Sequence, residues 1–393
     1  MSKSNKFAFE TRAIHAGQKP DPLTGAVVTP IYTASTFEQD SIGENRGFMY
    51  SRVKNPTRST LEACLADLEG AASALACPTG LSAAATILEL LDAGDHLIAH
   101  HDLYGGIYRL FAKVRNRSAA LNVDFVDFAD VEAVRQALRP DTKMLWFETP
   151  SNPLLDIVDM AAMVELAASV GAMTVCDNTF CSSYCQRPIA HGVDIVMHSA
   201  TKFLGGHSDL LAGVIAISPN VREGLAEELA FLQNSVGAAL DPTTASTLLR
   251  SLKTLPVRMD RHLQNTATIA QFLADNKPRL GIERLIYPGL ADHPGREIAR
   301  RQMLGFGSMI SFTLNGGAAR ANQIAQSLEL FTYAVSLGGV ESLVQHPASM
   351  THKIVPPEQR DRLGVTDNFL RLSIGIEHVD DLIRDLDTTL STN

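Results

Sequence analysis

The chain has 393 residues, of which 45% are hydrophobic and 20% charged, the proportions of an ordinary soluble globular protein large enough for more than one domain. Its formal net charge of −9 argues against nucleic acid or an anionic membrane as the main partner, because both are negatively charged. The five cysteines are odd in number and absent from the second half, so we expect no disulfide framework and a reducing, cytoplasmic location.

Residues 1–60 are predicted to form an arm. They lack long periodic runs, and the turn-forming sequences KPDPLTG and KNPTRST interrupt them. Their first part contains no apolar segment of signal-peptide length. An arm of this kind in a large protein usually packs on something else, so we expect it to contact a partner subunit.

Residues 71–88 contain no charged residue, over a length close to that of a transmembrane helix. Pro78, Thr79 and Gly80 interrupt this segment, and most of its other residues are small. The segment therefore predicts a buried strand, a tight turn and a buried helix, and no membrane span.

Short apolar runs alternate with helix-like segments over residues 61–256. Strand followed by helix, repeated, indicates βαβ units, which predict a largely parallel sheet with helices on both faces. The clearest expected strands are residues 96–100, 122–128, 143–150, 172–178, 193–199 and 211–218.

The last region, residues 257–393, follows the start of a long helix-like stretch in LKTLPVRMDRH. It contains three strand-like segments, at 308–314, 330–337 and 369–377. We expect a smaller α+β domain here, after the arm and the α/β domain.

A lysine occupies an unusual position after one of the predicted strands. Lys202 follows an apolar run, with Ser199 and Thr201 before it and the pair Gly205-Gly206 behind it. A surface lysine needs no such setting, whereas an amine nucleophile must be partly desolvated and have space for a ligand beside it. The pattern predicts a lysine that acts as an amine nucleophile or forms a Schiff base.

Neighbouring strand ends offer the groups that a phosphorylated cofactor needs, since ligands of open α/β sheets bind beyond the carboxyl ends of the strands. The backbone N–H groups of Gly80 and Leu81 open a predicted helix and could hold a phosphate. Ser199 and Thr201 could add hydroxyl donors, and Asp177 is a buried carboxylate that needs a cationic partner. With the lysine, these are the requirements of pyridoxal 5′-phosphate, whose pyridine nitrogen the carboxylate keeps protonated.

The run HSATKFLGGHSDLLAG resembles the lysine signature of the Cys/Met-metabolism (trans-sulfuration) pyridoxal-phosphate enzymes. That family includes cystathionine γ-synthases, cystathionine γ- and β-lyases and methionine γ-lyases. The similarity extends from TRAIHAG to RLSIGIE, nearly the whole chain, with the motifs in the family's order. It implies an α/β fold of the fold-type I, aspartate-aminotransferase-like class, and a homotetramer built from two active dimers.

The resemblance also implies roles for individual residues. Lys202 matches the lysine that holds the cofactor, and Tyr104 matches the tyrosine that stacks on its ring and helps to activate the incoming amino group. The other cofactor residues implied are Asp177 for the pyridine nitrogen, Gly80, Leu81, Ser199 and Thr201 for the phosphate, and Tyr50 and Arg52 for the phosphate of the neighbouring subunit. The substrate residues implied are Arg371 for the α-carboxylate, with Asn152 and Ser336 as orienting neighbours.

Four further positions bear on the substrate. Cystathionine-handling members tend to carry acidic residues where this chain has Met49 and Val335, and methionine γ-lyases carry a cysteine where it has Gly106. Arg109 matches the arginine that γ-synthases and cystathionine lyases use near a distal carboxylate. We expect a γ-lyase acting on cystathionine, methionine, homocysteine or an O-substituted homoserine such as canavanine. The alternatives are cystathionine γ-synthase and cystathionine β-lyase activity.

Three other interpretations fit less of the sequence. The spacing S-x-x-K from Ser199 to Lys202 also marks penicillin-recognising serine hydrolases, but SDL and KTL miss the companion motifs SDN and KTG. A non-enzymatic binding or scaffold protein would lack the yellow colour that the cofactor gives. Cys181 and Cys185 have no second Cys/His pair at zinc-like spacing, so we expect no metal site.

Overall fold

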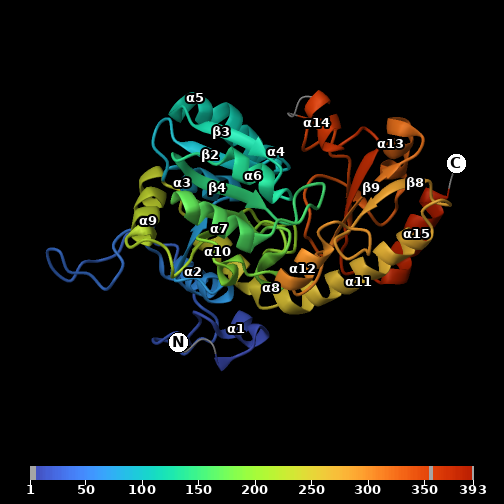
Figure 1. Cartoon of the computed structure of the whole chain (residues 1–393). Coiled ribbons are helices and arrows are strands. Elements are labelled where there is room, and N and C mark those ends of the chain that lie inside the picture. Colours follow the sequence, from blue (N-terminus) through green and yellow to red (C-terminus); the bar gives the residue numbers. More distant parts are fainter. Residues whose placement is uncertain (1–5, 354–356, 392–393) are drawn as a thin grey trace.

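Two β-sheets with helices packed against them form the body of the molecule, and an N-terminal arm extends from it (Figure 1). This computed structural model describes residues 6–353 and 357–391. The larger sheet is formed by the first two thirds of the chain and the smaller sheet by the last third, and the two lie side by side (Figure 1).

The large sheet contains seven strands in the order β1-β7-β6-β5-β4-β2-β3. Their bounds are β1 Ser73–Cys77, β2 His96–His100, β3 Asn122–Val126, β4 Thr142–Glu148, β5 Met173–Asp177, β6 Ile195–Ser199 and β7 Gly213–Ile217. β7 is antiparallel to both of its neighbours, and every other pair is parallel. All residues of β2 and β7 are buried, because helices cover both faces of the sheet. The predicted α/β class and largely parallel sheet are confirmed.

Helices before and between these strands begin and end at recognisable residues. α2 begins at Pro56, where the side chain of Asn55 caps the first turn, and ends at Glu69, which Gly70 follows in the left-handed conformation. The uncharged segment 71–88 forms β1, a turn and α3, as predicted. The helices up to the end of the large sheet are α1 Phe9–His15, α2 Pro56–Glu69, α3 Gly80–Leu88, α4 Gly105–Arg109, α5 Asn116–Ala119, α6 Val131–Ala137, α7 Met160–Val170 and α8 Ser182–Cys185, with a π-helical turn at Leu110–Arg115 and a 3₁₀ turn at Pro188–His191.

The small sheet has the strand order β10-β11-β12-β9-β8. Its bounds are β8 Ile282–Ile286, β9 Met309–Leu314, β10 Thr332–Tyr333, β11 Leu343–Gln345 and β12 Phe369–Ser373. The strand expected at 330–337 is only two residues long, because the chain turns at Ser336, whose φ is +99°. The helices of this part and its connection to the large sheet are α9 Leu225–Val236, α10 Pro242–Leu252, α11 Leu255–Asp275, α12 Arg296–Gln302, α13 Gly317–Ser327, α14 Pro357–Leu363 and α15 Val379–Leu390.

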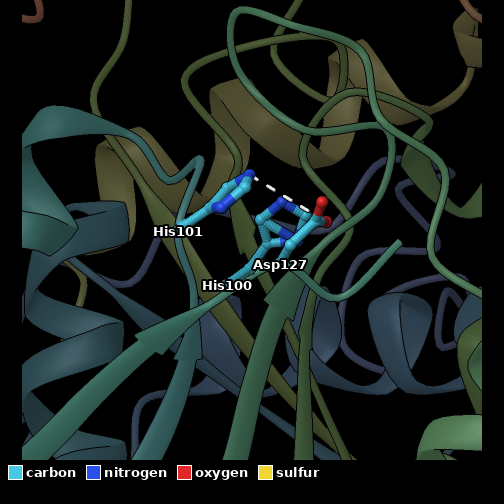
Figure 2. A group of neighbouring side chains, drawn as sticks. All are labelled: His100, His101 and Asp127. Atoms are coloured by element: carbon cyan, nitrogen blue, oxygen red, sulfur yellow. Dashed lines mark ion pairs between the residues drawn. The ribbon is translucent and has the colours of Figure 1, made fainter. Parts of the chain in front are cut away.

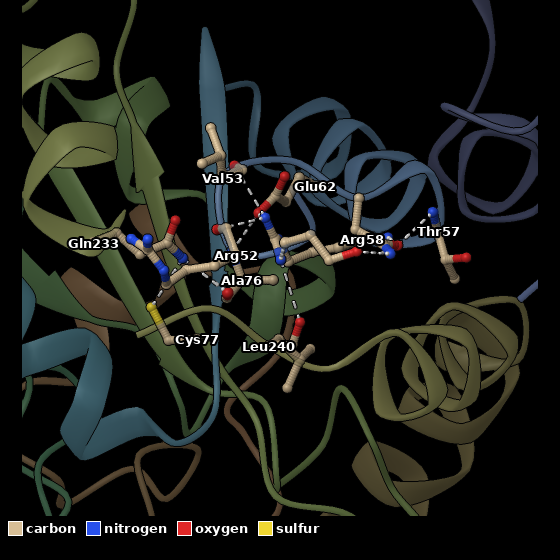
Figure 3. A network of polar contacts seen from close by, with 11 residues as sticks. Arg52, Val53, Thr57, Arg58, Glu62, Ala76, Cys77, Gln233 and Leu240 are labelled. Atoms are coloured by element: carbon tan, nitrogen blue, oxygen red, sulfur yellow. Dashed lines mark hydrogen bonds and ion pairs between the residues drawn. The ribbon is translucent and has the colours of Figure 1, made fainter. Parts of the chain in front are cut away.

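Arg58 of α2 fixes the end of the N-terminal arm (Figure 3). Its Nη1 donates to the carbonyl of Ser51 at 2.7 Å, and its Nη2 donates to the carbonyls of Arg52 at 3.2 Å and Val53 at 3.1 Å. Its Nε lies 3.4 Å from Oε1 of Glu62, whose pKa is raised to about 7 by burial. The backbone next to Tyr50 and Arg52 is therefore attached to α2, which packs against β1 and β7 of the large sheet.

The structure also bears on the cysteines and on the question of membrane-spanning helices. All five cysteines are free and buried, and burial raises the pKa of Cys64, Cys77 and Cys185 to about 12. Within residues 6–353 and 357–391, none of the helices combines the length and apolar character that a membrane-spanning helix requires.

Candidate active site

A cavity of about 400 Å³ opens at the carboxyl ends of β4, β5 and β6, between the large sheet and loops of the small one. Such a position is the usual one for a ligand of an open α/β sheet. The predicted site residues that line it are Gly80, Leu81, Tyr104, Asn152, Asp177, Ser199, Thr201, Lys202, Val335, Ser336 and Arg371. The fold thus brings eleven predicted residues to one cavity from positions spread over most of the chain.

Lys202 follows β6 and points into this cavity. Its Nζ donates to the hydroxyl of Ser336 at 2.6 Å. Burial, with a smaller contribution from the charge of Arg371, lowers the pKa of Lys202 to about 8. A lysine amine in this environment loses its proton far more readily than one in water, as a nucleophile or base requires.

Gly206, the second glycine behind Lys202, makes room for Arg258 of α11. Gly206 has a φ of +70°, and a Cβ there would collide with the guanidinium of Arg258. Arg258 Nη1 donates to the carbonyl of Phe203 at 2.7 Å, and Nη2 donates to that of Leu204 at 3.4 Å. Gly206 therefore allows α11 to hold the loop that carries the lysine.

α11 also holds the chain that follows β12. His262 Nδ1 donates to the carbonyl of Ile374 at 2.7 Å, and Asn265 Nδ2 donates to that of Gly375 at 3.1 Å. Arg371 lies on β12, three residues before Ile374. One helix thus contacts both the lysine loop and the strand of the predicted carboxylate-binding arginine.

Asp177 ends β5 and is only 5% exposed. Its Oδ1 accepts hydrogen bonds from the backbone N of Thr179 at 3.0 Å and from the Thr179 hydroxyl at 2.5 Å. The same hydroxyl accepts from the backbone N of Ser199 at 2.8 Å. Burial raises the pKa of Asp177, whereas the hydrogen bonds from Thr179 and the charge of His198 lower it. The carboxylate is held in one orientation and would be stabilised by a cation in the cavity.

The first turn of α3 lies against the end of β6. A Cβ at Gly80 would lie 2.9 Å from Cβ of Ser199, so only glycine permits this approach. Thr79 caps the helix, its hydroxyl accepting from the backbone N of Ser82 at 3.0 Å. Backbone N–H groups of this turn and the hydroxyls of Ser199 and Thr201 all border the cavity, where they match the needs of a phosphate.

Arg371 lies 2% exposed on the opposite side of the cavity. Its Nη1 donates to Oδ1 of Asn152 at 2.6 Å and its Nη2 to the carbonyl of Ser336 at 2.9 Å. Burial lowers the pKa of Arg371 to about 10, with the charge of Glu148 opposing this. The Nε of Arg371 has no hydrogen-bond partner among the described residues, so the guanidinium keeps donor capacity for a carboxylate.

Among the cavity residues that were not predicted, Glu148 and Thr179 form hydrogen bonds with predicted ones. Glu148 ends β4 and accepts a hydrogen bond from the backbone N of Tyr104 at 3.2 Å, and Thr179 orients Asp177. Burial and the charge of Asp177 raise the pKa of Glu148 well above its ordinary value. The strand-end rule that identified Asp177 applies equally to Glu148, and a threonine two residues after an aspartate is a common turn pattern.

Four predicted residues lie outside this cavity. Met49 and Tyr50 are 52% and 43% exposed on the arm, and Arg52 Nη1 donates to the side chain of Asn234 at 2.7 Å. These positions agree with a role in another subunit, but they leave that role a prediction. Arg109 lines an adjoining cavity that shares Tyr104 and Val335 with the first.

The family model described as "Cys/Met metabolism PLP-dependent enzyme" matches residues 10–391. The chain belongs to this family. Its cofactor is pyridoxal 5′-phosphate, and the serine-hydrolase and scaffold interpretations are thereby excluded.

Relatives with different activities in their names match nearly the whole chain. The cystathionine β-lyase of Coxiella burnetii is 51% identical over 389 residues, 99% of both chains. The cystathionine γ-synthase of Mycobacterium tuberculosis is 46% identical, over 97% of this chain and 96% of its own. The crystal structure of cystathionine γ-lyase from Lactobacillus plantarum, complexed with L-serine, has a TM-score of 0.94 at 42% identity, covering 98% of this chain and 99% of that one.

The residues present fit the family's cofactor. The first turn of α3 with its backbone N–H groups, the buried carboxylate of Asp177 and the desolvated amine of Lys202 border one cavity. These features match the phosphate, the pyridine nitrogen and the aldehyde of pyridoxal 5′-phosphate respectively.

Proposed function

We propose that this pyridoxal-phosphate enzyme is a γ-lyase that removes the γ-substituent of a homocysteine- or homoserine-type amino acid. The observation that carries the proposal is the setting of Lys202, whose Nζ is held by the Ser336 hydroxyl rather than by a carboxylate. γ-Elimination requires one base to remove protons first from Cα and then from Cβ. An amine with a lowered pKa, and with one neutral hydrogen-bond partner among the described residues, is suited to move between the two positions.

The other residues bind and orient the substrate. Arg371, positioned by Asn152, binds the α-carboxylate through its two-pronged guanidinium. When bound, the cofactor supplies an electron sink that lowers the cost of removing the α-proton, and Asp177 keeps its ring nitrogen protonated. Lys202 removes the protons from Cα and Cβ, and the hydroxyl of Tyr104 donates a proton to the departing γ-group. With one water, the products are the leaving group, ammonia and 2-oxobutyrate.

The adjoining cavity supports a substrate with a group beyond Cγ. It is lined by Tyr104, Gly106, Arg109 and Val335, and it is contiguous with the main cavity through Tyr104 and Val335. A Cβ at Gly106 would lie 2.5 Å from Cε1 of Tyr104, so a larger residue at position 106 would displace the tyrosine ring. Arg109 favours an acceptor-rich distal group over a distal ammonium.

The products distinguish this proposal from its main competitor. The competitor is cystathionine β-lyase activity, which the identity of 51% to the Coxiella burnetii enzyme of that name favours. The experiment incubates the purified holoenzyme with cystathionine, methionine, homocysteine and canavanine, and identifies the 2-oxo acid by mass spectrometry. γ-Elimination gives 2-oxobutyrate from all four, whereas β-elimination of cystathionine gives pyruvate and homocysteine. Pyruvate as the main oxo acid would overturn the proposal, and 2-oxobutyrate formed only in exchange for an added thiol would indicate a γ-synthase.

Replacing Val335 with glutamate should improve the use of cystathionine. Val335 is 58% exposed and lines both cavities, so a carboxylate there can reach the distal ammonium of cystathionine. Hydrogen bonds to charged groups contribute about 1.5–3 kcal/mol, and exposure favours the lower limit, so kcat/KM for cystathionine should rise about tenfold. The control is Val335→Gln, which has nearly the same size without the charge. An equal gain in both variants would show that charge is not the determinant.

We further propose that two subunits share each active site and that two such dimers form a tetramer. Tyr50 and Arg52 lie outside the cavity of their own chain, on an arm that Arg58 holds in place. Apolar side chains of the same arm are exposed, including Leu23 at 90% and Val27 at 78%, which suits burial against another subunit.

Mixing two inactive variants should therefore restore activity. In a dimer of one Lys202→Ala and one Arg52→Ala subunit, one of the two sites carries neither defect. Equal amounts should recover about a quarter of wild-type turnover, since half of the dimers are mixed. Mixing Lys202→Ala with Tyr104→Phe is the control, because these residues line the same cavity of one chain and no intact site can form. No recovery in the first mixture, with subunit exchange demonstrated by mass spectrometry, would contradict a shared site.

A further inference from the structure

Two histidines and an aspartate gather at the ends of two neighbouring strands (Figure 2), and none of the three lines the cavity that contains Lys202. His100 is the last residue of β2 and His101 follows it, while Asp127 comes directly after β3. The two strands are parallel, and the backbone N of His101 donates to the carbonyl of Val126 at 2.8 Å. The register of the sheet therefore places these three side chains together.

The three side chains have the spacing of a metal site whose ligands have not yet closed on an ion. One ligand atom from each residue lies within 4.8 Å of the other two, and His101 Nε2 is 3.9 Å from Asp127 Oδ1. Figure 2 shows the His101 and Asp127 side chains facing each other above the His100 ring. Ligand atoms bound to zinc at about 2.0–2.2 Å in a tetrahedron lie roughly 3.5 Å apart. Small rotations of the partly exposed side chains of His101 and Asp127 would close this difference.

His100 provides the second, independent observation. It is fully buried, yet neither of its ring nitrogens has a hydrogen-bond partner among the described residues. A histidine that serves only to pack, here against the ring of Phe128 at 5.7 Å, ordinarily satisfies at least one nitrogen.

We propose that His100, His101 and Asp127 bind one divalent ion of the zinc class, with the fourth coordination position open to water. Two imidazole nitrogens and one carboxylate oxygen form a donor set that such ions prefer over magnesium or calcium. The ion would link residues 100–101, shortly before Tyr104, to Asp127 after β3. Its role would be to stabilise this part of the fold. No step of the proposed elimination uses it, so this site stands or fails independently of the reaction.

The experiment measures zinc bound by the holoenzyme after treatment with a chelator and gel filtration. We expect isothermal titration to give one zinc per subunit for the wild type. His101→Asn and Asp127→Asn should each weaken zinc affinity at least tenfold while leaving the absorption of the bound cofactor unchanged. Both side chains are partly exposed, so these variants should fold, which circular dichroism checks.

A second His–Asp pair offers a matched control. His378 Nδ1 lies 3.9 Å from Asp380 Oδ2, the same separation as in the proposed site, but both side chains are about two-thirds exposed and no buried histidine is grouped with them in the described residues. His378→Asn should bind zinc as the wild type does. Zinc binding that is substoichiometric in the wild type, or equal in the wild type and the two site variants, would overturn the proposal. Competition by equimolar magnesium would also overturn it, because it would indicate a site for hard ions.

Discussion

Replacing Lys202 with alanine should lower turnover by about 10³-fold or more and remove the visible absorption of the covalently held cofactor. The amine is the group in the proposed site that both holds the cofactor and moves protons at two carbon atoms. Its buried setting, with a pKa lowered to about 8, has no replacement in the cavity, where the other ionisable groups are Tyr104, Glu148, Asp177 and Arg371. The measurement is kcat with the best substrate, together with the absorption spectrum.

The control for this variant is Lys113→Ala, which removes an exposed lysine and should leave both spectrum and turnover unchanged. Partial recovery of Lys202→Ala by an added small amine would show that the missing group is the base itself and not the fold. Turnover within tenfold of the wild type would contradict the assigned role.

Asp177→Asn should lower kcat about 100-fold, because an amide cannot stabilise a positive charge on the cofactor's ring nitrogen as a carboxylate does. The asparagine oxygen can still accept both hydrogen bonds from Thr179, so the variant changes charge with little change in geometry. The measurement is kcat and KM, with the cofactor content determined for each preparation.

Glu148→Gln provides the matched comparison, one strand away in the same register as Asp177. Burial and the charge of Asp177 raise the pKa of Glu148 well above its ordinary value, so glutamine changes this side chain less than asparagine changes Asp177. Glutamine can still accept the hydrogen bond from the backbone N of Tyr104, and kcat should stay within about threefold of the wild type. Equal losses in the two variants would mean that the charge of Asp177 is not what the reaction requires.

The sequence predicts those elements of the fold that depend on residues close together in the chain. Continuous apolar runs such as residues 96–100 and 211–218 indicate strands buried on both faces, and they are found in the large sheet. The strand expected at 330–337 fails because its length depends on Ser336, whose positive φ is maintained by surrounding structure rather than by propensity.

Some residues of the candidate site can likewise be predicted from local sequence, and others cannot. Lys202, Asp177 and Gly80 can be found from their positions at strand ends and at a helix start, where the topology brings them together. Arg371 and Ser336 come from the other sheet, and nothing local in the sequence places them opposite Lys202; only the family resemblance does. The grouping of His100, His101 and Asp127 depends on the pairing of two strands in register, which cysteine and histidine spacing along the chain does not show.

The two contacts that α11 makes limit where residues can be inserted into or deleted from this helix. Arg258, near its start, supports the lysine loop, and His262, one turn later, supports the segment after the arginine strand. Inserting or deleting one residue between them would rotate one support relative to the other by about 100° and shift it by about 1.5 Å along the axis. Such a change would replace no residue of the cavity. It would nevertheless shift the Lys202 amine relative to the Arg371 guanidinium. The spacing of four positions between Arg258 and His262 is therefore as much a part of the site as the residues that line it.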